Sequence, residues 1–185
     1  TKIYMTGGGA EALSHTFENV IIVDEMKALV NGVKKLYKGS DFLVANIGTG
    51  VSFIHSNETF ERIGGTSIAG GTFLALCKKL ANITNFHDAM DLASHCPTDN
   101  VDTTVGDIYN GDYDNLDLPS NMVAGFLGKL GRNDKEYDKA DIIRSILTMI
   151  STNICQLSYL YASTRNIPVI VFTGSFLRHN TITTT

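Results

Sequence analysis

Short apolar runs that end at glycine-containing turns are the feature that most limits how this chain can fold. The run Phe42–Ile47 leads into Gly48–Gly50, and Pro168–Phe172 leads into Thr173–Ser175. Runs of this length are too short for helices and are typical of strands buried on both faces of a sheet. Longer segments with helical spacing separate them, so the chain is expected to form an α/β fold with a mixed, mostly parallel sheet and flanking helices.

Four further segments have the character of strands. Lys2–Thr6 is short and rich in strand-forming residues, and Val20–Val23 is expected to be a buried parallel strand. Val51–His55 and Thr59–Ile63 flank a three-residue turn, which predicts one antiparallel hairpin.

Helices are predicted between these strands. Their spans are Glu11–Phe17, Asp24–Tyr37 with Asp24 as N-cap, Thr72–Leu80, Phe86–His95 and Lys139–Thr164. The stretch 97–121 is rich in Asp, Asn and Gly, and is expected to be loop with short turns.

Composition excludes several classes of partner. The net charge is −4 and basic residues do not cluster, which argues against a nucleic-acid or anionic-membrane surface. No apolar run is long enough to cross a bilayer. The three cysteines have no metal-binding spacing and are expected to be reduced thiols of a cytoplasmic protein, and the five histidines do not suggest a zinc site.

The glycine turns are candidate ligand sites. Ligands of open α/β sheets lie beyond the carboxyl ends of the strands, where glycine lets the backbone approach an anion. Thr49 and Ser175 would add hydroxyl groups, and Gly70-Gly71 opens a predicted helix whose positive end favours phosphate. A single glycine after a strand is most often an ordinary turn. Several such turns together favour a phosphate-binding site over the alternative, in which the glycines only form turns and allow tight packing. The spacing matches neither a P-loop nor a dinucleotide fingerprint.

Two charged residues stand near these turns. Glu25 follows a strand at the start of a helix, where it is either a solvated first-turn acid or a proton acceptor for an alcohol. Arg62 ends a hairpin strand, where it is either solvent-facing or a bidentate partner for phosphate or carboxylate.

The segments 46–52 and 62–74 resemble the central motifs of type II pantothenate kinases. Segments 6–10, 107–113 and 172–178 recur in the same order, so the resemblance covers nearly the whole chain. It implies the actin-like fold (acetate and sugar kinase, Hsp70, actin; ribonuclease H-like). It also implies ATP-dependent phosphorylation of pantothenate to 4'-phosphopantothenate, the first step of coenzyme A biosynthesis.

The resemblance implies roles for individual residues. Glu25 matches the catalytic proton acceptor, and Arg62 matches the arginine that binds pantothenate and the transferred phosphate. The nucleotide contacts matched are Gly48, Thr49, Gly50, Gly70, Gly71, Thr72, Phe73, Leu74, Phe86 and Ser175. Mg²⁺ would accompany ATP, although the residues of this chain include no matched metal ligand. The family is dimeric, so a homodimer with the helix 139–164 near the interface is expected, as is feedback by CoA or acyl-CoA that varies among members.

The chain departs from the family pattern at both ends. The family opens with an Asp-x-Gly-Gly-Thr strand that holds Mg²⁺ and phosphates and closes with a Gly-Ala-rich helix, and neither is present in residues 1–185. These residues are therefore expected to be the central part of a kinase and to be inactive alone. Two alternatives stay open: another actin-like small-molecule kinase, such as one for a sugar, and a catalytically silent nucleotide- or CoA-binding module.

Overall fold

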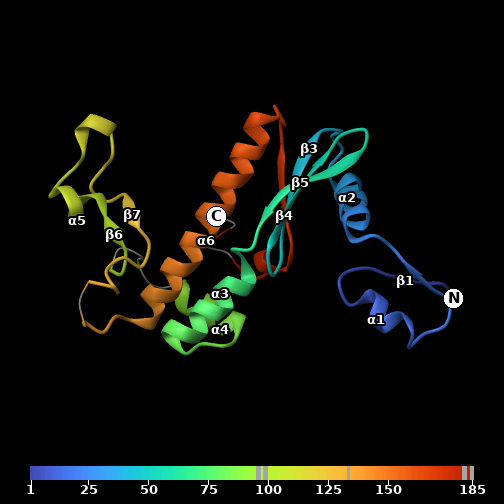
Figure 1. The fold of residues 1–185 in the computed structure, drawn as a ribbon, viewed down its shortest axis with the longest axis horizontal. Helices are drawn as coiled ribbons and strands as arrows, with labels where there is room; N and C mark the ends of the chain where they lie inside the picture. The colour runs from blue at the N-terminus through green and yellow to red at the C-terminus, as the bar shows by residue number, and fades with distance from the viewer. Residues whose placement is uncertain (95–96, 98–99, 133, 181–182, 184–185) are drawn as a thin grey trace. The chain divides into compact units, whose positions relative to one another are not determined.

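A computed structural model describes residues 1–94, 97, 100–132, 134–180 and 183. The chain forms two compact units (Figure 1). Unit 1 comprises residues 1–46, 52–64 and 158–173, and unit 2 comprises residues 47–51, 65–157 and 174–185. The predicted helix end at His95 and the thiol of Cys96 lie outside the described residues.

A four-stranded sheet in the order β5-β4-β3-β8 provides the main frame of unit 1. Its strands are β3 (Phe42–Ile47), β4 (Val51–Ser56), β5 (Phe60–Thr66) and β8 (Ile170–Thr173). β3 and β8 pair in parallel, with Leu43 opposite Ile170. Three-residue connections join β3 to β4 and β4 to β5, and such short links allow only antiparallel neighbours. The sheet is therefore mixed, and the prediction of a mostly parallel sheet was wrong.

Helix α2 (Glu25–Leu36) covers part of this sheet. Asp24 is its N-cap, because the Oδ1 atom accepts a hydrogen bond from the Lys27 N–H at 2.8 Å, as predicted. The apolar side of α2 contributes Val30 and Val33 to a buried cluster that also includes residues of β3 and β4. Helical spacing of apolar residues thus becomes the contact between a helix and a sheet.

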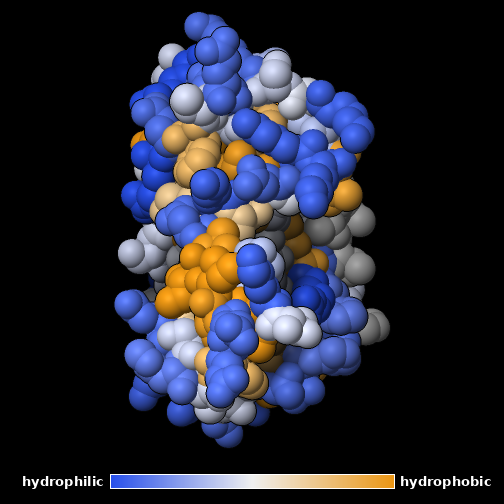
Figure 2. Space-filling view, turned by 90° about the vertical axis from the view of Figure 1, so that its right-hand side faces the viewer, coloured by the Kyte–Doolittle hydropathy of each residue, from blue (hydrophilic) through white to orange (hydrophobic). Residues whose placement is uncertain are grey.

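The N-terminal part of unit 1 is a small β–α–β arrangement. β1 (Ile3–Met5) and β2 (Val20–Ile22) pair in parallel, and α1 (Ala10–Ser14) lies between them in the sequence. The parallel pairing was predicted, but Ile22 of β2 is 50% exposed, so the prediction of a buried strand was wrong. Figure 2 shows hydrophobic residues, in orange, gathered near the middle of the face in view.

Unit 2 contains a pair of packed helices, α3 (Gly70–Leu76) and α4 (Phe86–Ala93) (Figure 1). A π-helical segment, η1 (Cys77–Ala81), continues α3 and ends at Asn82 in the left-handed conformation. Asn85 caps α4 by accepting the His87 N–H at 2.7 Å. The helix that was predicted from Thr72 therefore begins two residues earlier and widens in its second half.

The stretch predicted to be irregular contains short regular elements. These are β6 (Thr103–Thr104), α5 (Val105–Tyr109), η2 (Asp114–Leu116) and, beyond that stretch, β7 (Val123–Gly125), which pairs with β6 in antiparallel fashion. A capping box begins α5: the Thr104 hydroxyl accepts the Asp107 N–H, and the Asp107 carboxylate accepts the Thr104 N–H. Local capping therefore creates a helix too short for periodicity to predict.

Helix α6 (Lys139–Thr164) has the predicted bounds. Ile143, Ile146, Ile150 and Ile154 are buried along it, at three- and four-residue spacing. None of the helices in the described part of the chain has both the length and the apolar content that a bilayer span needs. After β8, Gly174 turns the chain into η3 (Ser175–Leu177), which reaches the candidate site.

Candidate functional site

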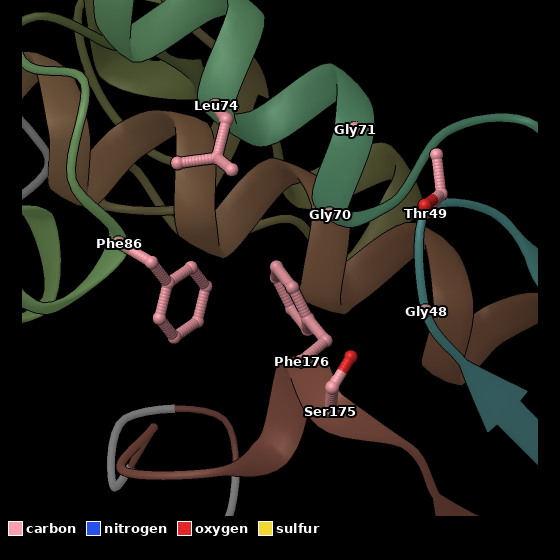
Figure 3. Close-up of a pocket in the computed structure, with 8 residues that line it drawn as sticks. All are labelled: Gly48, Thr49, Gly70, Gly71, Leu74, Phe86, Ser175 and Phe176. Carbon is pink, nitrogen blue, oxygen red and sulfur yellow. The ribbon is translucent and has the colours of Figure 1, made fainter.

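A cavity of about 300 Å³ lies within unit 2 and gathers most of the predicted nucleotide contacts (Figure 3). Four chain segments surround it: the turn after β3, helix α3, the start of α4 and the turn after β8. Its volume is at the lower end of the range for small-molecule sites. The residues that line it are Gly48, Thr49, Gly70, Gly71, Leu74, Phe86, Ser175 and Phe176.

Backbone hydrogen bonds tie the turn after β3 to the start of α3. The Gly70 N–H donates to the Gly48 carbonyl and the Gly71 N–H donates to the Thr49 carbonyl, each at 3.0 Å. The Gly48 N–H donates to the Gly50 carbonyl at 2.9 Å. The glycine turns were expected to let the backbone approach an anion, but the N–H groups of Gly48, Gly70 and Gly71 already donate to carbonyls of the protein itself. The bonds instead hold the turn and the helix start together.

The glycines have a second role, which is close approach of the backbone. A Cβ on Gly70 would lie 2.7 Å from the Gly48 carbonyl oxygen, and one on Gly71 would lie 2.8 Å from the Thr49 Cγ2 atom. Gly174 has φ +114° and its Cβ would collide with the Ile47 carbonyl. Glycine is required at these positions so that three backbone segments can meet around one cavity.

The polar and apolar parts of the cavity are separated. In Figure 3 the Thr49 and Ser175 hydroxyls lie on the side of the Gly48 turn, whereas Leu74 and Phe86 lie on the other side and the Phe176 ring lies between. The Phe176 ring makes edge-to-face contacts, at 5.8 Å between centroids, with Phe86 and with the buried Phe73. The cavity thus suits a ligand with one polar end and one flat apolar end.

Phe176 was missed as a lining residue by the sequence analysis. It follows Ser175 directly, so an apolar side chain at the exit of the last glycine turn was the available signal. In the structure it is 3% exposed, and its ring packs beside Gly70. The close approach of the ring to that glycine fixes one wall of the cavity.

Three predicted nucleotide contacts, Gly50, Thr72 and Phe73, do not line the cavity. Gly50 faces the backbone carbonyl of Thr66, from which an added Cβ would be 3.0 Å away. The Thr72 hydroxyl donates to the Ser67 carbonyl at 3.0 Å. Phe73 is fully buried and contacts the Phe86 ring.

The two predicted charged residues lie in unit 1. Glu25 is the exposed first residue of α2, and Arg62 is exposed on β5, where its Nε donates to the Ser52 hydroxyl at 3.3 Å. The cavity, by contrast, belongs to unit 2. Their assignment to the reaction stays a prediction.

Ionisable groups with shifted pKa values lie outside the cavity lining. Burial raises the pKa of the Cys77 thiol to about 12, which leaves it protonated and unreactive at neutral pH. Hydrogen bonds to its carboxylate lower the pKa of Asp107 to about 2. The bond from the Thr104 N–H has the largest effect, and the bond from the Lys129 side chain has the next largest. Within the described ranges, no three His, Cys, Asp or Glu side chains gather as metal ligands.

Comparison with known proteins decides the family. The Fumble family model matches residues 38–185. Type II pantothenate kinase from Bacillus anthracis is 34% identical over 97% of the chain and 67% of its own length. The chain belongs to the Fumble family. The resemblance to type II pantothenate kinases is thereby confirmed.

Other relatives show how much of a longer protein the chain matches. Pantothenate kinase 1 from Arabidopsis thaliana is 36% identical over 96% of the chain, which spans 56% of that relative. The mouse 4'-phosphopantetheine phosphatase is 40% identical over 77% of the chain, which spans only 18% of that protein. The chain therefore spans between about a fifth and two thirds of the curated relatives that it matches.

Proposed function

We propose that the protein phosphorylates the primary alcohol of pantothenate with ATP, which is the first step of coenzyme A biosynthesis. The observation that carries the proposal is a cavity with hydroxyl groups beside a glycine turn and aromatic rings opposite, in a chain of the Fumble family. Relatives named pantothenate kinase align with nearly the whole chain. We also propose the actin-like fold and a cytoplasmic location, in keeping with that family.

The residues of the cavity fit a nucleotide. Thr49 and Ser175 can donate hydroxyl hydrogen bonds to phosphate or ribose oxygens, and Phe86 with Phe176 offers apolar surface to a base. Bound ATP would supply the phosphoryl group that is transferred. Mg²⁺ is proposed as its companion ion, and no residue of the described chain is assigned to hold it.

In the proposed reaction, Glu25 accepts the proton of the pantothenate hydroxyl as its oxygen attacks the γ-phosphorus. The bond between the γ-phosphorus and the β,γ-bridging oxygen breaks, and ADP leaves. Arg62 binds pantothenate and offsets negative charge on the phosphoryl group during transfer. Thr49 contacts the phosphates and the Gly70–Leu74 segment encloses the nucleotide. Positioning and electrostatic stabilisation account for most of the rate in reactions of this type.

The substitution Glu25→Gln in the complete protein tests the proton-acceptor role. We expect turnover of ATP plus pantothenate to fall by about 100-fold or more, because the amide cannot accept the proton, while ATP binding changes little. Glu11→Gln is the matched control, since Glu11 is also an exposed first-turn acid of a helix. Coupled detection of ADP gives the rate, and calorimetry gives the ATP affinity.

Near-normal turnover of Glu25→Gln would remove this residue from the reaction. Phosphorylation of a sugar with indifference to pantothenate would instead identify another small-molecule kinase. The chain spans 56% of the Arabidopsis relative, so turnover is measured on the complete protein.

A catalytically silent nucleotide- or CoA-binding module is the second candidate. One comparison bears on it: a matching segment occurs over 18% of the length of a mouse protein named as a phosphatase, so the segment is not confined to proteins named as kinases. Binding of ATP or acyl-CoA without formation of phosphopantothenate would support this candidate. We also propose that CoA or acyl-CoA regulates the enzyme by feedback inhibition. Measuring the binding of these ligands, and their effect on turnover, tests this proposal.

A further inference from the structure

The division of the cavity into polar and apolar ends bears on how it distinguishes one nucleotide from another. The hydrogen-bonding side chains among the described lining residues are Thr49 and Ser175, and both lie on the side of the Gly48 turn (Figure 3). Leu74 and Phe86 make the opposite end, and the Phe176 ring lies between the two ends. A base bound there would meet hydrocarbon surfaces, which contact its face and not the edge that differs between bases.

Backbone carbonyls at the apolar end already accept hydrogen bonds within the protein. The Phe176 carbonyl accepts from the Asn180 Nδ2 atom at 3.3 Å, and the Leu74 carbonyl accepts from the Cys77 N–H. These bonds compete with any contact from the amino group of a base. The side chains and these carbonyls therefore favour stacking over reading of the base edge.

The rings are held in place, so the apolar end is built before a ligand arrives. Asn85 caps α4 and thereby fixes the position of Phe86, the first residue of that helix. Phe73, Phe86 and Phe176 contact one another edge-to-face at 5.7–5.8 Å between centroids. Phe86 is only half-buried, which leaves part of its ring surface to a ligand.

We infer that this cavity selects its nucleotide by the phosphates and by stacking, and so accepts purine nucleotides as a class, GTP as well as ATP. The inference rests on the proposed function, because it concerns the nucleotide of the same reaction. The expected preference for one nucleotide over another follows from how enzymes discriminate between similar substrates. Apolar pockets give ratios of kcat/KM of about 10- to 200-fold, whereas sites that hydrogen-bond a distinguishing group reach about 10⁴-fold or more.

The test compares ADP with GDP by calorimetry and ATP with GTP by initial rates, using the complete protein and saturating pantothenate. We expect the guanine and adenine nucleotides to differ by less than about 200-fold in both Kd and kcat/KM. A larger preference for adenine in the binding measurement overturns the inference. Failure of both ADP and GDP to bind also overturns it.

Variants separate stacking from general damage to the fold. Phe86→Ala should weaken ADP and GDP binding by a similar factor of about tenfold or more, because stacking surface is lost for both bases. Phe86→Leu should recover part of the affinity by restoring apolar contact. Phe17→Ala is the control, since Phe17 is 52% exposed and lies in unit 1. A loss confined to ADP would contradict the inference.

The binding arm also distinguishes this inference from the proposed function. Equal binding of ADP and GDP without phosphorylation of pantothenate would support the inference and reject the kinase. Phosphorylation by ATP together with binding of ADP alone would support the kinase and reject the inference.

Discussion

Single glycines decide whether the cavity can exist. Gly174 combines a left-handed backbone with contact against the Ile47 carbonyl, whereas Gly7 has φ +93° and open space around its missing side chain. Both positions disfavour an L side chain, but only Gly174 also excludes it by collision. Substitution of Gly7 therefore reports the cost of backbone strain alone, and substitution of Gly174 reports that strain together with the steric collision.

We expect Gly174→Ala to destabilise the protein by about 2 kcal/mol or more, since strain and collision add. Gly7→Ala, the matched control, should cost only about 1 kcal/mol, which is the strain of the backbone alone. Urea unfolding of both variants measures the two free energies. Equal losses would show that the contact with Ile47 adds nothing.

Residue chemistry in the site was partly predictable. A glycine after an apolar strand indicates a turn, and a hydroxyl within it indicates a polar contact, so Thr49 and Ser175 were found from the sequence. The use of glycine N–H groups was not predictable, because it depends on which carbonyls the fold brings opposite them. Gly70 and Gly71 donate to the turn after β3 for that reason.

At the scale of elements, capping decides the short helices and apolar spacing decides the long ones. The bounds of α6 agree with the prediction because 26 residues carry a continuous apolar pattern. Helix α5 has five residues and exists through its capping box. Neither α5 nor the π-helical widening after α3 has a periodic signal that a sequence pattern could show.

The capping box of α5 should depend on pH. The pKa of Asp107 is lowered from 3.8 to about 2, so the charged carboxylate stabilises the folded state above pH 4, and this contribution is lost as the pH falls through 2. We expect Asp107→Asn to be less stable than the original at pH 7 and to lose this difference near pH 2. Urea midpoints measured across this range provide the check.

Asp134→Asn is the control for this titration, because Asp134 is an exposed acid in the loop before α6. Its substitution should not reproduce the loss of stability at pH 7 that is expected of Asp107→Asn, because Asp134 is not part of the α5 cap. A stability difference for Asp107→Asn that stayed constant from pH 7 to pH 2 would contradict a role for the charge in the cap.

At the scale of the whole molecule, we propose a homodimer in which α6 lies near the interface. Tyr159 and Leu160 are 67% and 54% exposed on this helix. Large apolar side chains on an exposed helix face favour association when they are contiguous. The family resemblance supplies the expectation of a dimer, and α6 supplies a surface for it.

The substitution Leu160→Asp tests this interface in the complete protein. We expect it to shift the protein from dimer to monomer in sedimentation experiments, because a buried interface tolerates an unpaired carboxylate poorly. Leu36→Asp is the matched control, since Leu36 is 89% exposed on α2. Retention of the dimer by Leu160→Asp would place the interface elsewhere.

The sequence by itself determined the main elements, the glycine turns and the family of this protein, because apolar spacing, capping residues and contiguous motifs are local properties of a chain. The tertiary structure alone decided that the main sheet is mixed, that three glycine N–H groups bind the protein itself, and that Phe176 forms a wall of the cavity. These features depend on which distant segments meet in space, and local pattern carries no information about such long-range contacts.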